Sequence, residues 1–220
     1  MQYIFSEDAR KPQLKLSNEL YKYLVKVRRF KVDDEVNLRN LTDDNLYTYK
    51  IKDISKRGLT LTLVDSKLLK KELVDFEIFW CVVDTKTIEK SLVFLNQIGV
   101  TKITFIYCDR SQKNFKLDFQ RFQKIVINSN QQCGRVHVME FDLASSLQDV
   151  IQDNNDLYAL DFGGKTELDK KIKKVLVGCE GGFSDKEREI FSQNSKISFK
   201  TEHILKSETA CMAIASKLLL

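Results

Sequence analysis

The feature that most constrains the fold of this chain is a change of periodicity near residue 70. Before it, short β-branched runs with a period near two (EVNLRN, LYTYKIKDI and GLTLTLVD) are joined by polar turns. Closely spaced runs of this kind predict a small antiparallel barrel or sandwich. After it, apolar runs alternate with amphipathic helix patterns, which predicts a largely parallel sheet with helices on both faces. We therefore expect two domains, residues 1–70 and 71–220.

Several helix ends in the second domain carry local signals. Gly99 and Gly134 follow helix patterns, and glycine commonly ends a helix because it tolerates a positive φ. Ser184 followed by Glu187 is the pattern of a capping box. Ser207 is the expected N-cap of the last helix.

Glycine is scarce in this chain and unevenly placed. Of its 8 glycines, five lie within twenty consecutive positions: Gly163, Gly164, Gly178, Gly181 and Gly182. The strand pattern KVLVG ends at Gly178, so this loop is expected at the carboxyl edge of the sheet, where open parallel sheets bind ligands. The loop has neither the Lys-Ser/Thr of a P-loop nor the G-x-G-x-x-G spacing of a dinucleotide fold. The alternative is a tight strand-to-helix turn without a ligand.

The positive charge is concentrated in the first third of the chain. Residues 1–70 hold 15 Lys and Arg against 10 Asp and Glu, whereas residues 71–220 hold 21 of each kind. Within YKYLVKVRRFK, basic side chains alternate with aromatic ones. This composition suits phosphate contacts combined with base stacking. The alternative is a solvated basic face with no ligand.

Composition also excludes several classes of protein. No apolar stretch reaches the roughly 18 to 20 residues of a membrane helix, and MQYIFSEDARK lacks the pattern of a signal peptide. The 5 cysteines are widely spaced without a C-x-x-C pair, and only 2 histidines accompany them, so we expect no metal site. We expect buried, reduced cysteines in a cytoplasmic protein.

Three stretches resemble the motifs of a known family. VGCEGGFSDKERE resembles G-P-E-G-G-[FL]-S-x-x-E, and ILKSETACMAIA resembles I-L-R-x-E-T-A-x-x-A. YLVKVRRFKVDDEV resembles H-L-x-x-V-L-R-x-x-x-G-D-x-[IV]. These motifs are similar to those of the RsmE family of 16S rRNA uridine-N3 methyltransferases, in the SPOUT superfamily. Cys179, Lys206 and Tyr23 depart from the family pattern.

The resemblance implies an α/β fold with a SPOUT-type parallel sheet and a C-terminal trefoil knot, preceded by a small PUA-like β-barrel domain. It implies S-adenosylmethionine as cofactor, bound in the knot against backbone from three loops. It also implies a homodimer that acts on 16S rRNA, within the small ribosomal subunit. The cofactor-binding residues it implies are Leu160, Phe162, Gly178, Glu180, Gly181, Gly182, Ile204, Leu205 and Ser207.

The same resemblance suggests how the remaining roles are divided. Arg110, Arg135 and Lys206 are candidates for contacting the target nucleotide or its phosphates. Glu180 and Glu208 are the acids of the matched motifs, and each is either a base or a carboxylate that stabilises a helix N-terminus. The candidate RNA-docking residues of the first domain are Arg10, Lys22, Lys26, Arg28 and Arg29. Orientation of the target base is the expected main catalytic effect, and the general base stays open.

Two other functions remain compatible with the sequence. One is a SPOUT methyltransferase with another target atom, either a ribose 2′-oxygen or a different base nitrogen. The other is a catalytically silent rRNA-binding module that serves ribosome assembly.

Overall fold

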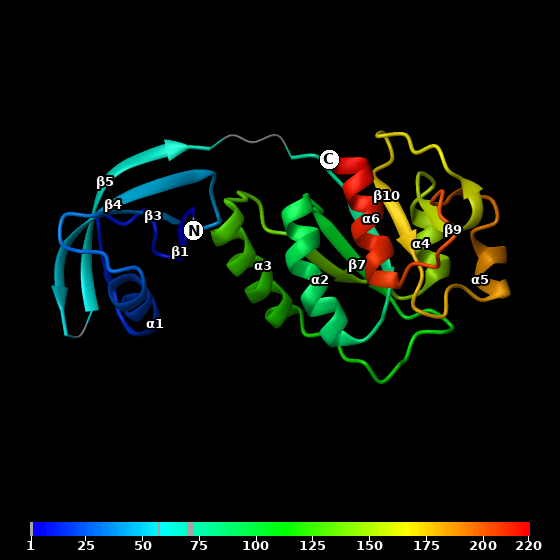
Figure 1. Ribbon diagram of the computed structural model, residues 1–220, viewed down its shortest axis with the longest axis horizontal. Coiled ribbons are helices and arrows are strands. Elements are labelled where there is room, and N and C mark those ends of the chain that lie inside the picture. The colour runs from blue at the N-terminus through cyan, green and yellow to red at the C-terminus, as the bar shows by residue number, and fades with distance from the viewer. Residues whose placement is uncertain (1, 57, 70–72) are drawn as a thin grey trace. The chain divides into compact units, whose positions relative to one another are not determined.

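The chain divides into two units (Figure 1). The computed structural model describes residues 2–56, 58–69 and 73–220. The first unit joins the residues up to 72 with a later segment, 130–137, and the second contains residues 73–129 and 138–220. The expected boundary between residues 70 and 71 lies outside the described residues.

The first unit is built on a five-stranded sheet. Four of its strands pair antiparallel as expected, and the short β1 runs parallel to β3. Alternate residues of β4 are buried, including Tyr49 and Ile51, because successive strand side chains point to opposite faces. The strands, in sheet order, are β1 (Ile4–Phe5), β3 (Glu35–Arg39), β4 (Asn45–Ser55), β5 (Gly58–Leu68) and β2 (Gln13–Leu16).

The basic segment that follows β2 is helical. A short helix α1 (Asn18–Tyr21) continues into a π-helical turn η1 (Lys22–Val27). Leu24 is fully buried in the core of this unit, while the flanking Lys22 and Lys26 are exposed. The buried leucine therefore holds the segment in place and leaves its cations in solvent.

A buried arginine that sequence patterns did not indicate binds residues 130–137, which we call the returning segment because they rejoin the first unit. Arg39 is fully buried, and its guanidinium donates to the backbone oxygens of Val136 (3.0 Å), Asp43 (2.9 Å) and Asn45 (3.2 Å). The Tyr3 hydroxyl donates to the Arg135 oxygen (2.8 Å). Burial raises the pKa of Tyr3 to about 12.

The second unit contains a six-stranded sheet in which every pair of neighbouring strands is parallel. This confirms the parallel sheet expected from the alternating patterns. Parallel strands place their carboxyl ends at one edge. The strands, in sheet order, are β11 (Ser195–Ile197), β9 (Tyr158–Lys165), β10 (Lys174–Val177), β6 (Glu77–Cys81), β7 (Lys102–Ile106) and β8 (Glu140–Leu143).

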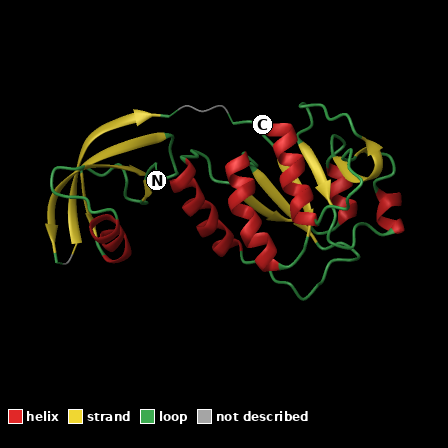
Figure 2. Ribbon diagram, viewed as in Figure 1, coloured by secondary structure: helices red, strands yellow, loops and turns green. Residues whose placement is uncertain are grey.

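Helices lie between most of these strands in the sequence, and α6 follows the last strand (Figure 2). They are α2 (Thr85–Ile98), α3 (Phe119–Cys133), α4 (Leu147–Asp153), α5 (Asp185–Ile190) and α6 (Ser207–Leu219). Gly99 ends α2 with φ 121°, and Gly134 follows α3 with φ 79°, as the sequence predicts. α2 packs beside α6, and α6 contacts β10 (Figure 1).

Candidate functional site

A cavity of about 510 Å³ opens at the carboxyl edge of the second unit's sheet. Three segments supply most of its lining: the end of β9, the glycine loop that follows β10, and the stretch that runs from residue 198 into α6. Arg110, after β7, and Arg188, on α5, also line it. β9 and β10 are neighbouring parallel strands, so their carboxyl ends bring the first two segments together. The cavity therefore lies where open parallel sheets bind ligands.

All of the cofactor-binding residues named from the sequence line this one cavity. They are Leu160, Phe162, Gly178, Glu180, Gly181, Gly182, Ile204, Leu205 and Ser207. Arg110 also lines it, whereas Lys206 and Glu208 are not among its lining residues and Arg135 belongs to the first unit. The structure thus assembles the expected loops. The chemical role of each residue stays a prediction.

The geometry of the loop favours glycine at two positions. Gly182 has φ 67°, a left-handed conformation that other residues rarely adopt. A Cβ atom on Gly178 would lie 3.3 Å from both the Gly182 Cα and the Phe183 ring. The loop folds back tightly on itself, and it presents bare backbone to the cavity.

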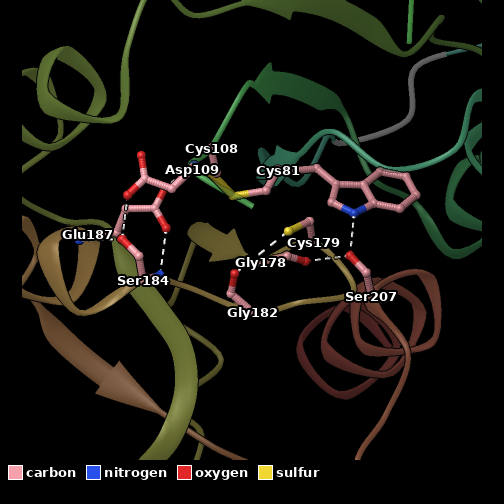
Figure 3. Close-up of a disulfide and its surroundings, with 10 residues drawn as sticks. Cys81, Cys108, Asp109, Gly178, Cys179, Gly182, Ser184, Glu187 and Ser207 are labelled. Carbon is pink, nitrogen blue, oxygen red and sulfur yellow. Dashed lines mark hydrogen bonds between the residues drawn. A yellow bond between two sulfur atoms is a disulfide. The ribbon is translucent and has the colours of Figure 1, made fainter. Parts of the chain in front are cut away.

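A buried relay fixes one end of this loop (Figure 3). The Trp80 indole N–H donates to the Ser207 hydroxyl (2.8 Å), which donates to the Gly178 carbonyl oxygen (2.5 Å). Trp80 is fully buried and Ser207 is 4% exposed, so water does not compete for these bonds. The relay sets the orientation of the Gly178 peptide and of the first turn of α6.

The expectation that Ser207 is the N-cap of the last helix was wrong. The N-cap is Lys206, whose side chain makes no capping bond, and Ser207 is the first residue inside α6. Its hydroxyl instead takes part in the relay with Trp80 and Gly178. The Ser207 hydroxyl bonds to Trp80 on β6 instead of capping the helix. A sequence pattern does not reveal a partner so far away in the chain.

A second network fixes the other end of the loop (Figure 3). The capping box expected at α5 is present, with the Ser184 hydroxyl accepting from the Glu187 N–H and the Glu187 carboxylate accepting from the Ser184 N–H. Glu187 is 3% exposed and also accepts from the Asp109 N–H (2.8 Å). The Arg110 guanidinium then donates to the Gly181 oxygen (2.6 Å). These bonds join the segment after β7 to the glycine loop.

The expectation that all of the cysteines are reduced and buried was wrong at three positions. Cys81 and Cys108 form a disulfide, and Cys133 is exposed. Cys81 ends β6 and Cys108 follows the neighbouring strand β7, which places their Cα atoms 5.7 Å apart. A separation of 27 residues gave no hint of this pairing. Cys179 and Cys211 are buried free thiols, and burial raises the pKa of each.

An ion pair at the cavity was also missed. Arg188 on α5 donates through Nε (2.8 Å) and Nη2 (3.3 Å) to the two carboxylate oxygens of Asp161. The Asp161 side chain is 6% exposed, so this pair is held within the wall. Bonding to Asp161 raises the pKa of Arg188. The capping box draws attention to Glu187, but nothing in the sequence links Arg188 to a strand 27 residues earlier.

The candidate RNA-docking residues lie together in the first unit. Every one of them is exposed to solvent, in agreement with either a phosphate-contacting or a merely solvated surface. Arg10 and Arg29 have positive φ angles of 127° and 60°, which mark tight turns of the backbone. Burial lowers the pKa of Arg135, which lies in the returning segment. The residues are Arg10, Lys22, Lys26, Arg28 and Arg29.

The described parts of the chain, residues 2–56, 58–69 and 73–220, carry neither of two further features. Within them, no cluster of His, Cys, Asp and Glu side chains is arranged to hold a metal ion. No helix there is both long enough and apolar enough to cross a membrane.

Comparisons with known proteins place this geometry in a family. An RNA methyltransferase domain model matches residues 70–219, and an RNA methyltransferase PUA domain model matches residues 16–64. Ribosomal RNA small subunit methyltransferase E of Helicobacter pylori is 39% identical over 98% of both chains. The protein of the same name from Aquifex aeolicus is 28% identical over 100% of this chain and 99% of its own.

Solved structures share the fold. The Neisseria gonorrhoeae ribosomal RNA small subunit methyltransferase E, bound to S-adenosyl methionine, superposes with a TM-score of 0.80 at 14% identity, covering 99% of this chain and 96% of its own. A Legionella pneumophila methyltransferase with bound cofactor gives 0.80 at 21% identity and the same coverage. The expected α/β fold with an N-terminal PUA-like unit is confirmed. This chain belongs to the RsmE family of ribosomal RNA small subunit methyltransferases.

Proposed function

We propose that this chain transfers a methyl group from S-adenosylmethionine to N3 of a specific uridine in 16S rRNA. The observation that carries the proposal is the convergence of three loops on one cavity in a member of the RsmE family. The N3 position and the 16S substrate come from the family resemblance, and they are tested below.

The cavity suits this cofactor in size and lining. Its volume of about 510 Å³ falls in the usual range of small-molecule sites. Peptide groups of the glycine loop offer hydrogen-bond donors and acceptors, and Leu160, Phe162 and Ile204 offer apolar cover. The S-methyl sulfonium supplies an already activated methyl group. The task left to the protein is to hold the target nitrogen in line with the S–CH3 bond.

We also propose that the C-terminal segment forms the trefoil knot of the SPOUT superfamily. A close approach between two neighbouring strands agrees with this: a Cβ on Gly164 in β9 would come within 2.5 Å of the backbone of Ile197 in β11. The contact from Ser207 to Gly178 ties the start of α6 to the loop after β10. Glycine at these positions lets chain segments pass at the short range that a knot requires.

Arg110 is the side chain we assign to positioning the target nucleotide. It lines the cavity, and its bond to the Gly181 oxygen holds the cation beside the glycine loop. A cation there stabilises negative charge that develops on the uracil imide. We keep Lys206 and Arg135 as candidates for contacts with the nucleotide or its flanking phosphates. Glu208 stays a candidate for either a base or a carboxylate that stabilises the N-terminus of α6.

The first unit is proposed to dock the RNA backbone. Its exposed cations would contact phosphates, which position the RNA without specifying a base. We expect the double variant Arg28→Glu, Arg29→Glu to weaken RNA binding and flatten its salt dependence, with cofactor affinity unchanged. The charge-matched control is Lys170→Glu, Lys171→Glu on the second unit. An unchanged salt slope in the first variant would remove this segment from the RNA interface.

The assembly and its location are proposed on the same basis. We propose a cytoplasmic homodimer that acts on rRNA within the small ribosomal subunit. Sedimentation equilibrium of the purified protein distinguishes a dimer from a monomer.

Methyl transfer to small-subunit RNA tests the function directly. Free 16S rRNA and assembled small subunits are incubated with the protein and isotopically labelled S-adenosylmethionine, and the nucleosides are separated by mass spectrometry. We expect N3-methyluridine. A 2′-O-methyl nucleoside or another methylated base nitrogen would indicate the alternative target atom. A protein that neither binds the cofactor nor transfers the methyl group would be the silent assembly module.

A further inference from the structure

The proposed reaction needs a proton acceptor. Uridine N3 carries a proton and is a poor nucleophile until that proton leaves. If the proposed function holds, the acceptor is a titratable group that lines the cavity. Besides two arginines, the titratable groups there are Asp161, Cys179, Glu180 and His203.

Two of these groups are already engaged. Both carboxylate oxygens of Asp161 accept from Arg188, and the side chain is almost fully buried. The Cys179 thiol points to the Gly182 oxygen (3.6 Å), and burial raises its pKa, which keeps it protonated. Neither group is free to take a proton from a substrate.

The other two belong to different classes of base. Glu180 lies in the glycine loop and is exposed. A carboxylate ordinarily titrates near pH 4, far below the pH at which a general base works best in the cell. Imidazole is the side chain whose ordinary titration falls between pH 5 and 8. On chemical grounds the histidine is the better acceptor.

The position of His203 agrees with that role. Its imidazole is exposed at the cavity and forms no hydrogen bond with any residue that the structure describes. Its backbone N–H donates to the Thr201 hydroxyl (3.1 Å), which steadies the chain beneath it. The next residue, Ile204, is 82% exposed, and Phe162 in the cavity lining is 70% exposed. These two apolar side chains offer a surface for a flat base beside the imidazole.

We propose that His203 is the general base that removes the N3 proton of the target uridine. An unprotonated imidazole nitrogen accepts the proton, and the N3 electron pair forms the new N–CH3 bond. The S–CH3 bond breaks with its electrons passing to sulfur. The protonated imidazole then releases its proton to water.

Several charged groups lie near this imidazole and affect how the rate of methyl transfer depends on pH. The cavity places Asp161 and Arg188 on one wall as a neutralised pair, and Glu180 and Arg110 on the glycine-loop side, with the protonated Cys179 thiol. On its own segment the neighbours are Glu202 and Lys206. The expected sign comes from imidazole itself: methyl transfer rises with pH as the ring loses its proton.

The experiment compares His203→Gln with wild type across pH. We expect about a 100-fold lower single-turnover rate and loss of the acid-side limb of the pH profile. Cofactor affinity, measured by calorimetry, should remain at the wild-type value. The matched control is His137→Gln, which replaces the other histidine of the chain and lies in the first unit. It should keep both the rate and the profile.

Two readouts separate a base from a residue that merely shapes the site. RNA carrying 5-fluorouridine at the target has a more acidic N3, and it should partly rescue His203→Gln but give little gain with wild type. Since the chain has 2 histidines, NMR of the imidazole carbons can follow the ring of His203 as the RNA is added. Its signal should shift on binding.

Each outcome decides the assignment. If wild type transfers methyl groups and His203→Gln keeps its rate and profile, the assignment is overturned and the proposed function stands. A slow variant with the wild-type profile and no rescue by 5-fluorouridine also overturns it. If wild type transfers no methyl group to any small-subunit RNA, the proposed function fails and the base assignment fails with it.

Discussion

Replacing Trp80 with phenylalanine tests how the core controls the cofactor site. Phenylalanine keeps a ring in the core but removes the N–H that donates to Ser207. The lost buried hydrogen bond should cost about 1 kcal/mol of unfolding free energy. Phenylalanine is smaller than tryptophan and leaves part of the fully buried Trp80 site unfilled, which should cost about 1–2 kcal/mol more. The sum of about 2–3 kcal/mol corresponds to a melting temperature lower by about 4–12 °C.

The more informative effect is on the cofactor. Without Trp80, the Ser207 hydroxyl loses one of its two partners, and the Gly178 peptide is oriented less firmly. If about 1 kcal/mol of that positioning is lost, the dissociation constant for S-adenosylmethionine should rise about fivefold. Isothermal titration calorimetry measures this value, at a temperature well below the melting point of the variant.

A neighbouring core residue supplies the control. Phe105 is fully buried and stacks against Trp80 with ring centroids 6.0 Å apart. Phe105→Leu should lower stability by about 1–2 kcal/mol and leave cofactor affinity unchanged. If Trp80→Phe binds the cofactor as tightly as wild type, or if both variants lose affinity equally, the relay does not position Gly178 and the reasoning is wrong.

Three other features give independent predictions. Gly164→Ala should lower the unfolding free energy, measured in urea, by about 2–3 kcal/mol, because its Cβ would overlap the Ile197 backbone at 2.5 Å; a loss under 0.5 kcal/mol would contradict that close approach. Burial raises the pKa of Tyr3 to about 12, above its unfolded value of 10, so its contribution is complete below pH 10 and is lost as pH rises toward 12. Stability measured by urea unfolding should fall more steeply in wild type than in Tyr3→Phe over that interval, and parallel curves would refute the burial. Alkylation of the denatured protein without reductant should label three thiols if Cys81 and Cys108 are paired, and five labels would rule the disulfide out.

Local signals in the sequence predict much of the second unit. Alternating apolar and amphipathic runs identify the parallel sheet, and Gly99 and Ser184 mark helix ends as they do in the structure. The helix-end signals are reliable because each depends on residues within one turn of the same helix.

The residues that the sequence did not reveal depend on distant partners. In the sequence, Arg39 is an ordinary cation at the end of a strand pattern. In the structure, its guanidinium binds the backbone oxygen of Val136, 97 positions away. The Ser207 hydroxyl is drawn from its expected capping role by Trp80, 127 positions earlier. Pairings at such separations follow only from the topology of the sheet. The location of the site was predictable from its glycines, but the bonds that hold its loops were not.

Nucleoside mapping of small subunits methylated by the purified protein tests the central claim most directly. The substrate particles must come from cells that lack this methylation, and mass spectrometry of the digested 16S rRNA then identifies the product. We predict a single new N3-methyluridine whose appearance requires S-adenosylmethionine. A digest with no new methylated nucleoside, or with methylation on a ribose oxygen instead, would contradict the proposed reaction.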